Sequence, residues 1–293
     1  MLSTHDIVGS FSISYNLYSR IAKRFAWNEY NIMAMLRSLV SCQLLQTSVR
    51  GTARTLRSDK RLAKACGFRK KIPDQSWINR FRDAVADLLP EIFYELVNKL
   101  KQLGVVSGRD WSIDATHVDA YANKYRKKKS DPDATWGYKN SQKKWFFGYK
   151  THIVCDSEQE LPIGYSVTTG CVHDSKPANP LLNKTRQKTK MMPERVRGDG
   201  AYNSTNIREN IRHYGAIDDI PHKGEARKKK KENKRASIEH INSRQKEHFN
   251  LNNLKLRGLA KATAHIGLCL IAQLQTAITN HKHRLNVRQV IHT

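Results

Sequence analysis

The spacing of apolar residues changes along the chain. Between residues 28 and 101 they recur every three or four positions, as at Ile32 and Leu36, which predicts amphipathic helices. Asp74 is a helix-start signal, and Pro90 predicts a break between two helices in this part of the chain. The first part of the chain is therefore predicted to be all-helical.

After Gly104 the pattern of apolar residues becomes typical of strands separated by helices. Strands are predicted at residues 111–118, 145–155, 161–169, 195–198 and 216–220. Helices are predicted through Leu181 after a cap at Asp174, from Ser204 to about Tyr214, and around Glu239. The order of strand, strand, strand, helix, strand, helix, strand, helix predicts an α/β fold.

This change in the sequence pattern predicts two domains. Residues 1–107 form an all-helical domain, and residues 108–293 form an α/β core. The first carries many arginines and lysines, such as Arg50, Arg54 and Arg57. Basic helical faces are typical of a module that contacts DNA, and a plain helical cap on the second domain is the alternative.

Charge narrows the class of partner. The 293 residues include 52 lysines and arginines against 26 acidic residues, a formal net charge of +26. An excess of this size favours a polyanionic partner, above all nucleic acid. No membrane is expected, because the apolar stretch 259–278 is interrupted by residues such as Lys261 and Gln273. The amino terminus shows no export signal and the five cysteines show no zinc spacing, so a cytoplasmic protein is expected.

In so basic a chain, acidic residues at strand ends are candidates for holding divalent cations against phosphate. Asp114 lies in the first predicted strand of the core, and Asp199 follows the fourth, between two glycines. Carboxylate oxygens are the ligands that Mg²⁺ prefers, and paired ions serve phosphodiester chemistry. Asp199 taken alone is equally a turn or cap residue. Asp174 is interpreted as a helix cap in preference to a metal contact.

The third acidic candidate is Glu239. Arg235 precedes it by four residues and Lys246 follows it by seven, so one helical face would carry all three side chains. A carboxylate between two cations suits a metal ligand beside bound phosphates, with the cations gripping the DNA backbone. A solvated helix with ordinary ion pairs is the alternative.

Two basic clusters are candidate DNA contacts. The first includes Lys127, Lys128 and Lys129 and is followed by aromatic residues from Trp136 to Phe146. The second, from Lys223 to Arg235, includes Lys228, Lys229 and Lys230. A cationic loop beside aromatic rings suits DNA binding, whereas a solvated loop that attracts any polyanion is the alternative.

Taken together, several segments resemble the catalytic domain of bacterial and archaeal insertion-sequence transposases with a DDE triad. They are SIDATHVDA, GYKTH, VHDSKPANPLL, RGDGAY and the R-x3-E-x6-K spacing, in this order and over roughly residues 108–280. The segment PDQSWINRFR likewise resembles the amino-terminal domain of such transposases. One departure is Glu232, where many relatives have a tyrosine, which removes a possible stacking or phosphate contact at the transposon end.

The resemblance implies a ribonuclease-H-like fold, a catalytic triad of Asp114, Asp199 and Glu239, and two Mg²⁺ or Mn²⁺ ions. It further implies that a homodimer binds double-stranded DNA, both transposon ends and target, in association with the nucleoid. The leading hypothesis is therefore a metal-dependent DNA transposase. A non-catalytic, transposase-derived DNA-binding protein and a nuclease of the same fold are the alternatives; strand cleavage excludes the first and strand transfer the second.

Overall fold

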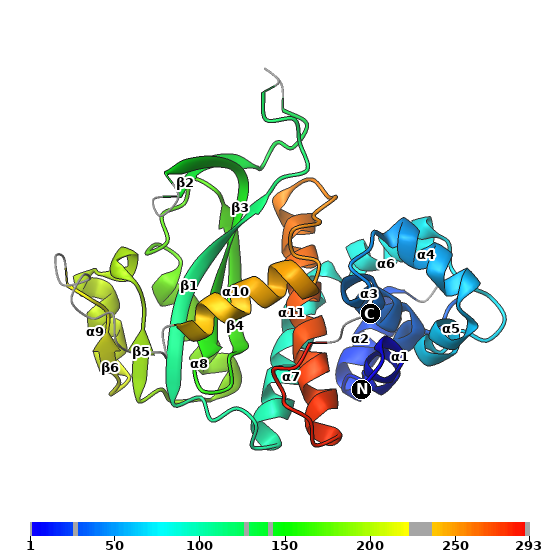
Figure 1. The fold of residues 1–293 in the computed structure, drawn as a ribbon, viewed down its shortest axis with the longest axis horizontal. Coiled ribbons are helices and arrows are strands. Elements are labelled where there is room, and N and C mark those ends of the chain that lie inside the picture. The colour runs from blue at the N-terminus through cyan, green and yellow to red at the C-terminus, as the bar shows by residue number, and fades with distance from the viewer. Residues whose placement is uncertain (1, 26–28, 126–128, 140–142, 223–235, 291–293) are drawn as a thin grey trace. The chain divides into compact units, whose positions relative to one another are not determined.

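The computed structural model describes residues 2–25, 29–125, 129–139, 143–222 and 236–290. Its contacts divide the chain into two compact units (Figure 1). Unit 1 comprises residues 1–96, 244–256 and 260–293, and unit 2 comprises residues 97–243 and 257–259. Two helices, α7 (Leu89–Gln102) and α10 (Ala236–His248), run from one unit into the other.

Unit 2 is built on one mixed sheet. Its strands are β1 (Asp110–Asp119), β2 (Thr135–Lys139), β3 (Lys144–Asp156), β4 (Leu161–Thr169), β5 (Arg195–Arg197) and β6 (Ile217–Asp219). β1 lies between β3, which is antiparallel to it, and β5, which is parallel; β4 pairs antiparallel with β3 and β6 parallel with β5. The path β4-β3-β1-β5-β6, with three antiparallel strands and then two parallel ones, is the ribonuclease-H-like arrangement, so the predicted fold class is confirmed.

Apolar side chains on β1, β3 and β5 form the centre of this unit. Trp111, Tyr149, Ile153 and Val196 are fully buried, and the Trp111 indole nitrogen donates to the Gly108 carbonyl at 2.8 Å. The strand predictions are confirmed to within one or two residues for all five segments. β2 was not predicted from the sequence; it extends the sheet by pairing with the first half of β3.

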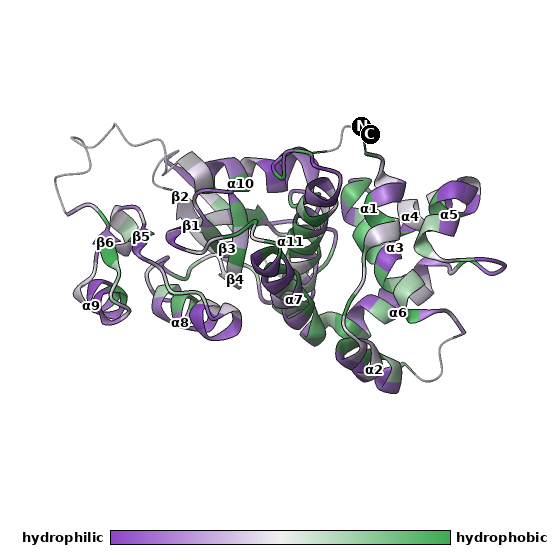
Figure 2. Cartoon of the chain, turned by 90° about the horizontal axis from the view of Figure 1, so that it is seen from below, coloured by the Kyte–Doolittle hydropathy of each residue, from purple (hydrophilic) through white to green (hydrophobic). Residues whose placement is uncertain are grey.

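Two helices of this unit, α8 (Ala178–Thr189) and α9 (Thr205–His213), pack beside the sheet (Figure 2). The Ser204 hydroxyl accepts a hydrogen bond from the Ile207 amide, which confirms the predicted start of α9. Asp174, by contrast, does not cap α8, so that prediction was wrong. The residue before α8 is Pro177, and it makes no side-chain cap.

Unit 1 is helical. Apart from its parts of α7 and α10, its helices are α1 (Thr4–Ser10), α2 (Tyr15–Arg24), α3 (Ile32–Leu44), α4 (Val49–Ser58), α5 (Lys60–Cys66), α6 (Gln75–Val85), the 3-10 turn η1 (Ala86–Leu88) and α11 (Leu259–Lys282). Asp74 caps α6 by accepting from the Trp77 amide, and η1 separates α6 from α7 just before Pro90; both signals were predicted from the sequence.

The carboxy-terminal helix α11 belongs to unit 1 from Ala260 onward, although the sequence places it in a domain of residues 108–293. Its residues are buried around its whole circumference, and Gln275 donates to the Ser10 hydroxyl at 2.8 Å. The compact units therefore do not follow the predicted boundary between residues 107 and 108. The physical reason is that an all-round apolar helix needs partners on every side, and the amino-terminal helices supply them.

Among the described residues, α11 is long and apolar enough to cross a membrane, and the bent pair α3–α4 would meet the same criteria as one broken span. Within the protein, 94% of the apolar window of α11 is buried. A core helix meets these criteria equally well, so length and composition here are weak evidence for a membrane span.

Candidate active site

The pairing of β1 with β5 brings Asp114 and Asp199 together. Ser112 on β1 is paired with Arg197, the last residue of β5. Asp114 lies two residues beyond Ser112, and Asp199 lies two residues beyond Arg197 with an extended backbone. Because neighbouring strands lie about 4.8 Å apart, continuing this register places the two aspartates side by side.

Asp199 stands at a turn directly after β5. Its carboxylate accepts a hydrogen bond from the Ala201 amide at 2.9 Å and caps the 3-10 turn η3 (Gly200–Tyr202). A Cβ atom on Gly198 would meet the Tyr202 ring at 3.2 Å, whereas one on Gly200 would meet nothing within 4 Å. Gly198 therefore allows the tyrosine to pack closely, and Gly200 leaves the backbone after Asp199 open to approach.

Glu239 comes from the first turn of α10. Ile238 and Ile241 are buried and fix this part of the helix in unit 2, while the Glu239 side chain is exposed. On the same helix, the Asn242 side-chain amide donates to Asp114 Oδ2 at 3.0 Å. This hydrogen bond ties α10 to β1 at the acidic residues.

The electrostatics show that these carboxylates act on one another. Burial, together with the negative charges of Asp199, Asp174 and Glu239, raises the pKa of Asp114 to about 7. Within the described part of the chain, no ion pair is formed by Asp114, Asp199 or Glu239. Asp114 therefore lies within electrostatic reach of three other carboxylates, and of these four acidic groups only Asp174 is paired with a basic side chain among the residues that the structure describes.

Two polar groups beside the acidic residues are buried and lack hydrogen-bond partners in the described part of the chain. They are the Tyr202 hydroxyl and the Asn242 side-chain oxygen. Burial, together with the charges of Asp114, Asp174 and Asp199, raises the pKa of Tyr202 well above its ordinary value. A neutral hydroxyl and an amide oxygen without partners are groups that a bound ligand or ordered water would satisfy.

Asp174 has a different environment from the other three. It accepts a hydrogen bond from Lys150 at 2.8 Å, and Lys150 also donates to the Val172 carbonyl. His152, on the same strand as Lys150, is buried and shares a hydrogen bond of 2.9 Å with the Thr168 hydroxyl; burial lowers the pKa of His152 to about 4. A neutral histidine and a paired aspartate therefore border the acidic cluster.

The chemistry of these carboxylates suits a hard divalent cation, because oxygen ligands and net negative charge are what Mg²⁺ and Mn²⁺ prefer. Their spacing in this conformation is wider than an ion requires. Within the described ranges, no three side chains of His, Cys, Asp or Glu are grouped closely enough to hold a metal ion. The donor set fits, and closing it requires side-chain movement.

The predicted basic residues are only partly described. Lys129 lies over the Phe147 ring at 4.6 Å and the Trp136 ring at 5.6 Å. Lys246 lies on α10, seven residues beyond Glu239. The others fall outside the described residues: Lys127, Lys128, Lys228, Lys229, Lys230 and Arg235.

Sequence reasoning missed Asn242. No local signal marks an asparagine three residues after Glu239 on an exposed-looking helix. The i, i+3 spacing from Glu239 is the only available hint, because residues so spaced share one helix face.

Comparison with protein families gives two matches. The model described as "Transposase DDE domain" matches residues 109–274, and the model described as "Transposase domain (DUF772)" matches residues 10–84. None of the curated protein sequences compared with the chain is significantly similar to it. The DDE match spans β1, the turn after β5 and α10, which carry Asp114, Asp199 and Glu239 respectively.

Solved structures give weaker likenesses. A piggyBac transposase synaptic complex with hairpin DNA has 10% sequence identity and a TM-score of 0.48, over 99% of this chain and 76% of that one. A Mos1 transposase paired-end complex with left transposon end has 11% identity and a TM-score of 0.26, over 94% and 82% of the two chains.

Proposed function

Because the chain belongs to the transposases with a DDE domain, we propose that it binds the terminal inverted repeats of an insertion sequence, cuts there and joins the cut ends to target DNA. Asp114, Asp199 and Glu239 are its catalytic residues in this proposal. The observation that supports the assignment is the raised pKa of Asp114 on β1, to which the negative charges of Asp199, at the end of β5, and of Glu239, on α10, both contribute.

In this proposal, the three acidic residues bind metal from different parts of the fold. Asp114, on β1, and Asp199, in the turn after β5, would hold the ions, and Glu239 would complete the site from α10. Two Mg²⁺ or Mn²⁺ ions, when bound, supply activation of the attacking oxygen and stabilisation of the leaving one. The high pKa of Asp114 agrees with this role, since a carboxylate crowded by like charges gains most from a cation.

The reaction consists of two in-line displacements at phosphorus. A water molecule first attacks the phosphodiester at the transposon end, so that a P–O bond to water oxygen forms and the bond to the 3′ oxygen breaks. The water's proton leaves to solvent, and the 3′ oxygen takes up a proton. The resulting 3′ hydroxyl then attacks a phosphodiester of target DNA, forming one P–O bond and breaking another. No covalent protein intermediate is needed.

Binding of double-stranded DNA rests on basic side chains beside aromatic ones. Lys124 lies 5.9 Å from the Trp136 ring centroid, and Lys129 lies over Phe147. The neighbouring rings of Tyr138 and Trp145 are 5.0 Å apart, with exposed fractions of 43% and 60%. This edge of the sheet offers cations and aromatic faces together, a combination suited to DNA near the scissile phosphate.

The remaining predicted DNA contacts extend the same surface chemistry. Arg235 and Lys246 flank Glu239 along the sequence at four and seven residues and would grip phosphates beside the cut. Lys127 and Lys128, with Lys228, Lys229 and Lys230, would add contacts that do not depend on base sequence. Joining two transposon ends in one event requires at least a homodimer on DNA.

The test uses purified protein with duplex DNA that carries the element's own ends, in Mg²⁺ and in Mn²⁺. Wild-type protein is expected to release a 3′ hydroxyl and to join pre-cut ends to target DNA. Asp114→Asn, Asp199→Asn and Glu239→Gln should each reduce cleavage by at least about 1,000-fold, roughly 4 kcal/mol of barrier, while duplex binding stays within about twofold.

Glu247→Gln is the matched control, because this exposed carboxylate lies on the same helix as Glu239 and loses the same charge. It should cleave like wild type. An active Glu239→Gln enzyme would refute the assignment of the third residue. Binding without nicking in either metal would favour a non-catalytic DNA-binding protein, and cleavage without joining would favour a nuclease.

A further inference from the structure

Helix α8 has one strongly basic surface that no assigned function uses. From Ser175 to Pro193 the chain contains five lysines and arginines and no acidic residue. Leu181, Leu182, Thr185 and Thr189 are buried, so the other side of the helix faces outward. The outward side borders a cavity of about 660 Å³.

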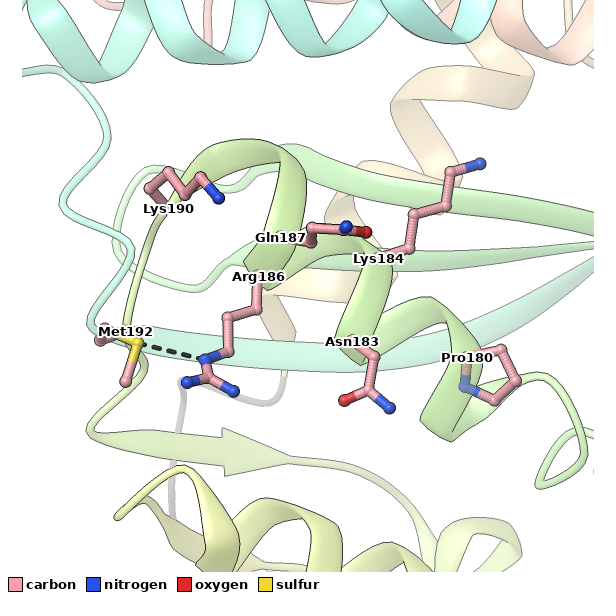
Figure 3. Close-up of a pocket in the computed structure, with 7 residues that line it drawn as sticks. All are labelled: Pro180, Asn183, Lys184, Arg186, Gln187, Lys190 and Met192. Atoms are coloured by element: carbon pink, nitrogen blue, oxygen red, sulfur yellow. Dashed lines mark hydrogen bonds between the residues drawn. The ribbon is translucent and has the colours of Figure 1, made fainter.

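The cavity has cations on both of its flanks (Figure 3). Lys184 and Lys190 project from one side of the helix and Arg186 from the other. Side-chain amides lie between the cations, and the described residues that line the cavity are Pro180, Asn183, Lys184, Arg186, Gln187, Lys190 and Met192. Among the described lining residues the charged and polar groups are cations and neutral amides and include no carboxylate, a combination that attracts oxyanions.

Contacts with α9 and the following loop hold part of this lining in place. The Arg186 guanidinium lies 4.8 Å from the centroid of the Tyr214 ring, and its Nε donates to the Met192 sulfur at 3.2 Å. The Tyr214 hydroxyl donates to the Asn183 side-chain oxygen. Asn183 and Arg186 therefore have defined positions before any ligand arrives, which lowers the entropic cost of binding.

The cations on the other flank are held together at an electrostatic cost. Partial burial and the positive charge of Lys188 lower the pKa of Lys184. Lys190 adopts a left-handed backbone conformation, with φ of 53°, at the position after a helix where glycine is favoured. Cations near a helix carboxyl terminus interact favourably with the helix dipole, and Arg186 and Lys188 lie in the last turn of α8.

We propose that this α8 groove, defined by the seven lining residues, binds the phosphate backbone of duplex DNA without regard to base sequence. The inference rests on the proposed transposase function and extends it to a second DNA-contacting surface, separate from the acidic residues. Lysine, arginine and amide donors carry no information on base identity when they bind phosphates, so the contact positions DNA without selecting it. An approach by DNA would relieve the repulsion between Lys184 and Lys188.

The test measures how duplex binding depends on salt, with DNA of unrelated sequence. The variant Lys184→Gln/Lys190→Gln removes two cations from the groove. Because each phosphate contact contributes about 0.9 to the slope of log K against log salt concentration, the slope should become shallower by about 2. Lys184→Arg/Lys190→Arg should retain the wild-type slope, because arginine also binds phosphate.

A matched control removes the same net charge elsewhere on unit 2. Arg109→Gln/Arg212→Gln changes two exposed cations that already pair with Glu194 and Asp218. The wild-type slope is expected for this control. Equal loss of slope in the control and the groove variant, or no loss in the groove variant, would overturn the proposal.

Failure of this inference is distinguishable from failure of the proposed function. If the groove variant keeps the wild-type salt slope and the wild-type protein cuts and joins transposon ends, only the proposed DNA binding by the groove is refuted. If the wild-type protein neither cuts nor joins DNA, but the groove variant has a shallower salt slope than wild type, the transposase activity is refuted and the proposed DNA binding by the groove is supported. Wild-type protein with no affinity for duplex DNA would overturn both.

Discussion

Replacing Asp114 with asparagine should make the metal-free protein more stable at pH 8. The pKa of this carboxyl is raised from an ordinary value of 3.8 to about 7 by burial and by the nearby acidic residues. The folded protein therefore binds the Asp114 proton more tightly than the unfolded chain, and ionisation opposes folding. The penalty is absent below about pH 4, grows as pH rises toward 7, and is complete above that value.

The size of the effect follows from linkage. A rise in pKa from 3.8 to about 7 corresponds to ~4 kcal/mol, at 1.36 kcal/mol for each pH unit. Because the side chain keeps some contact with solvent, about 2 kcal/mol is the expected gain for Asp114→Asn at pH 8. With a slope of 2–3 kcal/mol per molar urea for a chain of this size, the midpoint should rise by roughly 0.7–1 M. The gain should disappear at pH 4.

Urea unfolding followed by tryptophan fluorescence measures this, since Trp111 is fully buried on the same strand. Mg²⁺ should stabilise wild type by about 2.7 kcal/mol at a hundred times its dissociation constant, and should stabilise Asp114→Asn far less. Asp119→Asn, an exposed change at the end of β1, is the control and should match wild type. Equal pH dependence in wild type and Asp114→Asn would refute the reasoning.

Two further changes test the supports of the site. Asn242→Leu removes the donor to Asp114 Oδ2 and should raise the metal concentration needed for half-maximal cleavage by about 10–100-fold. A cleavage assay with a Mn²⁺ titration measures this concentration. The control Ser243→Ala should leave it unchanged. Arg197→Met leaves the carboxylates of Asp110 and Asp219 without their buried partner and should cost about 3–5 kcal/mol in urea unfolding. A loss below ~1 kcal/mol would show that the ion pairs are replaceable.

The regular elements of the core could be predicted because their signals are local. Alternating apolar residues mark β1 and β4, and Ser204 and Asp74 start their helices by accepting nearby amides, which needs no knowledge of the rest of the chain. β2 lacked such a signal. A Cβ atom added at Gly137 would lie 2.4 Å from the Phe146 ring and from the Gly170 carbonyl oxygen, so the packing requires glycine here. The same glycine weakens the strand pattern in the sequence.

In two parts of the chain, a distant partner outweighs a local preference. Asp174 has the side chain of a helix cap, but Pro177 and Pro180 delay the start of α8 to Ala178, and the carboxylate pairs with Lys150. The carboxy-terminal helix follows the catalytic segments along the chain. Its apolar circumference nevertheless groups most of it with the amino-terminal helices. Lys150 is distant from Asp174 in the sequence, and the amino-terminal helices are distant from α11.

The proximity of Asp114 and Asp199 depends on strand register, and a buried ion pair at the other end of the contact specifies that register. Arg197 on β5 donates through two nitrogens to Asp110 on β1, at 3.0 and 2.9 Å, and through a third to Asp219 on β6 at 2.6 Å. A shift of β5 by one residue would turn Arg197 to the opposite face of the sheet and strand all three charges. The same shift would carry Asp199 away from Asp114. We interpret the Arg197 cluster as the feature that aligns β1, β5 and β6, so that two aspartates 85 positions apart in the sequence become neighbours.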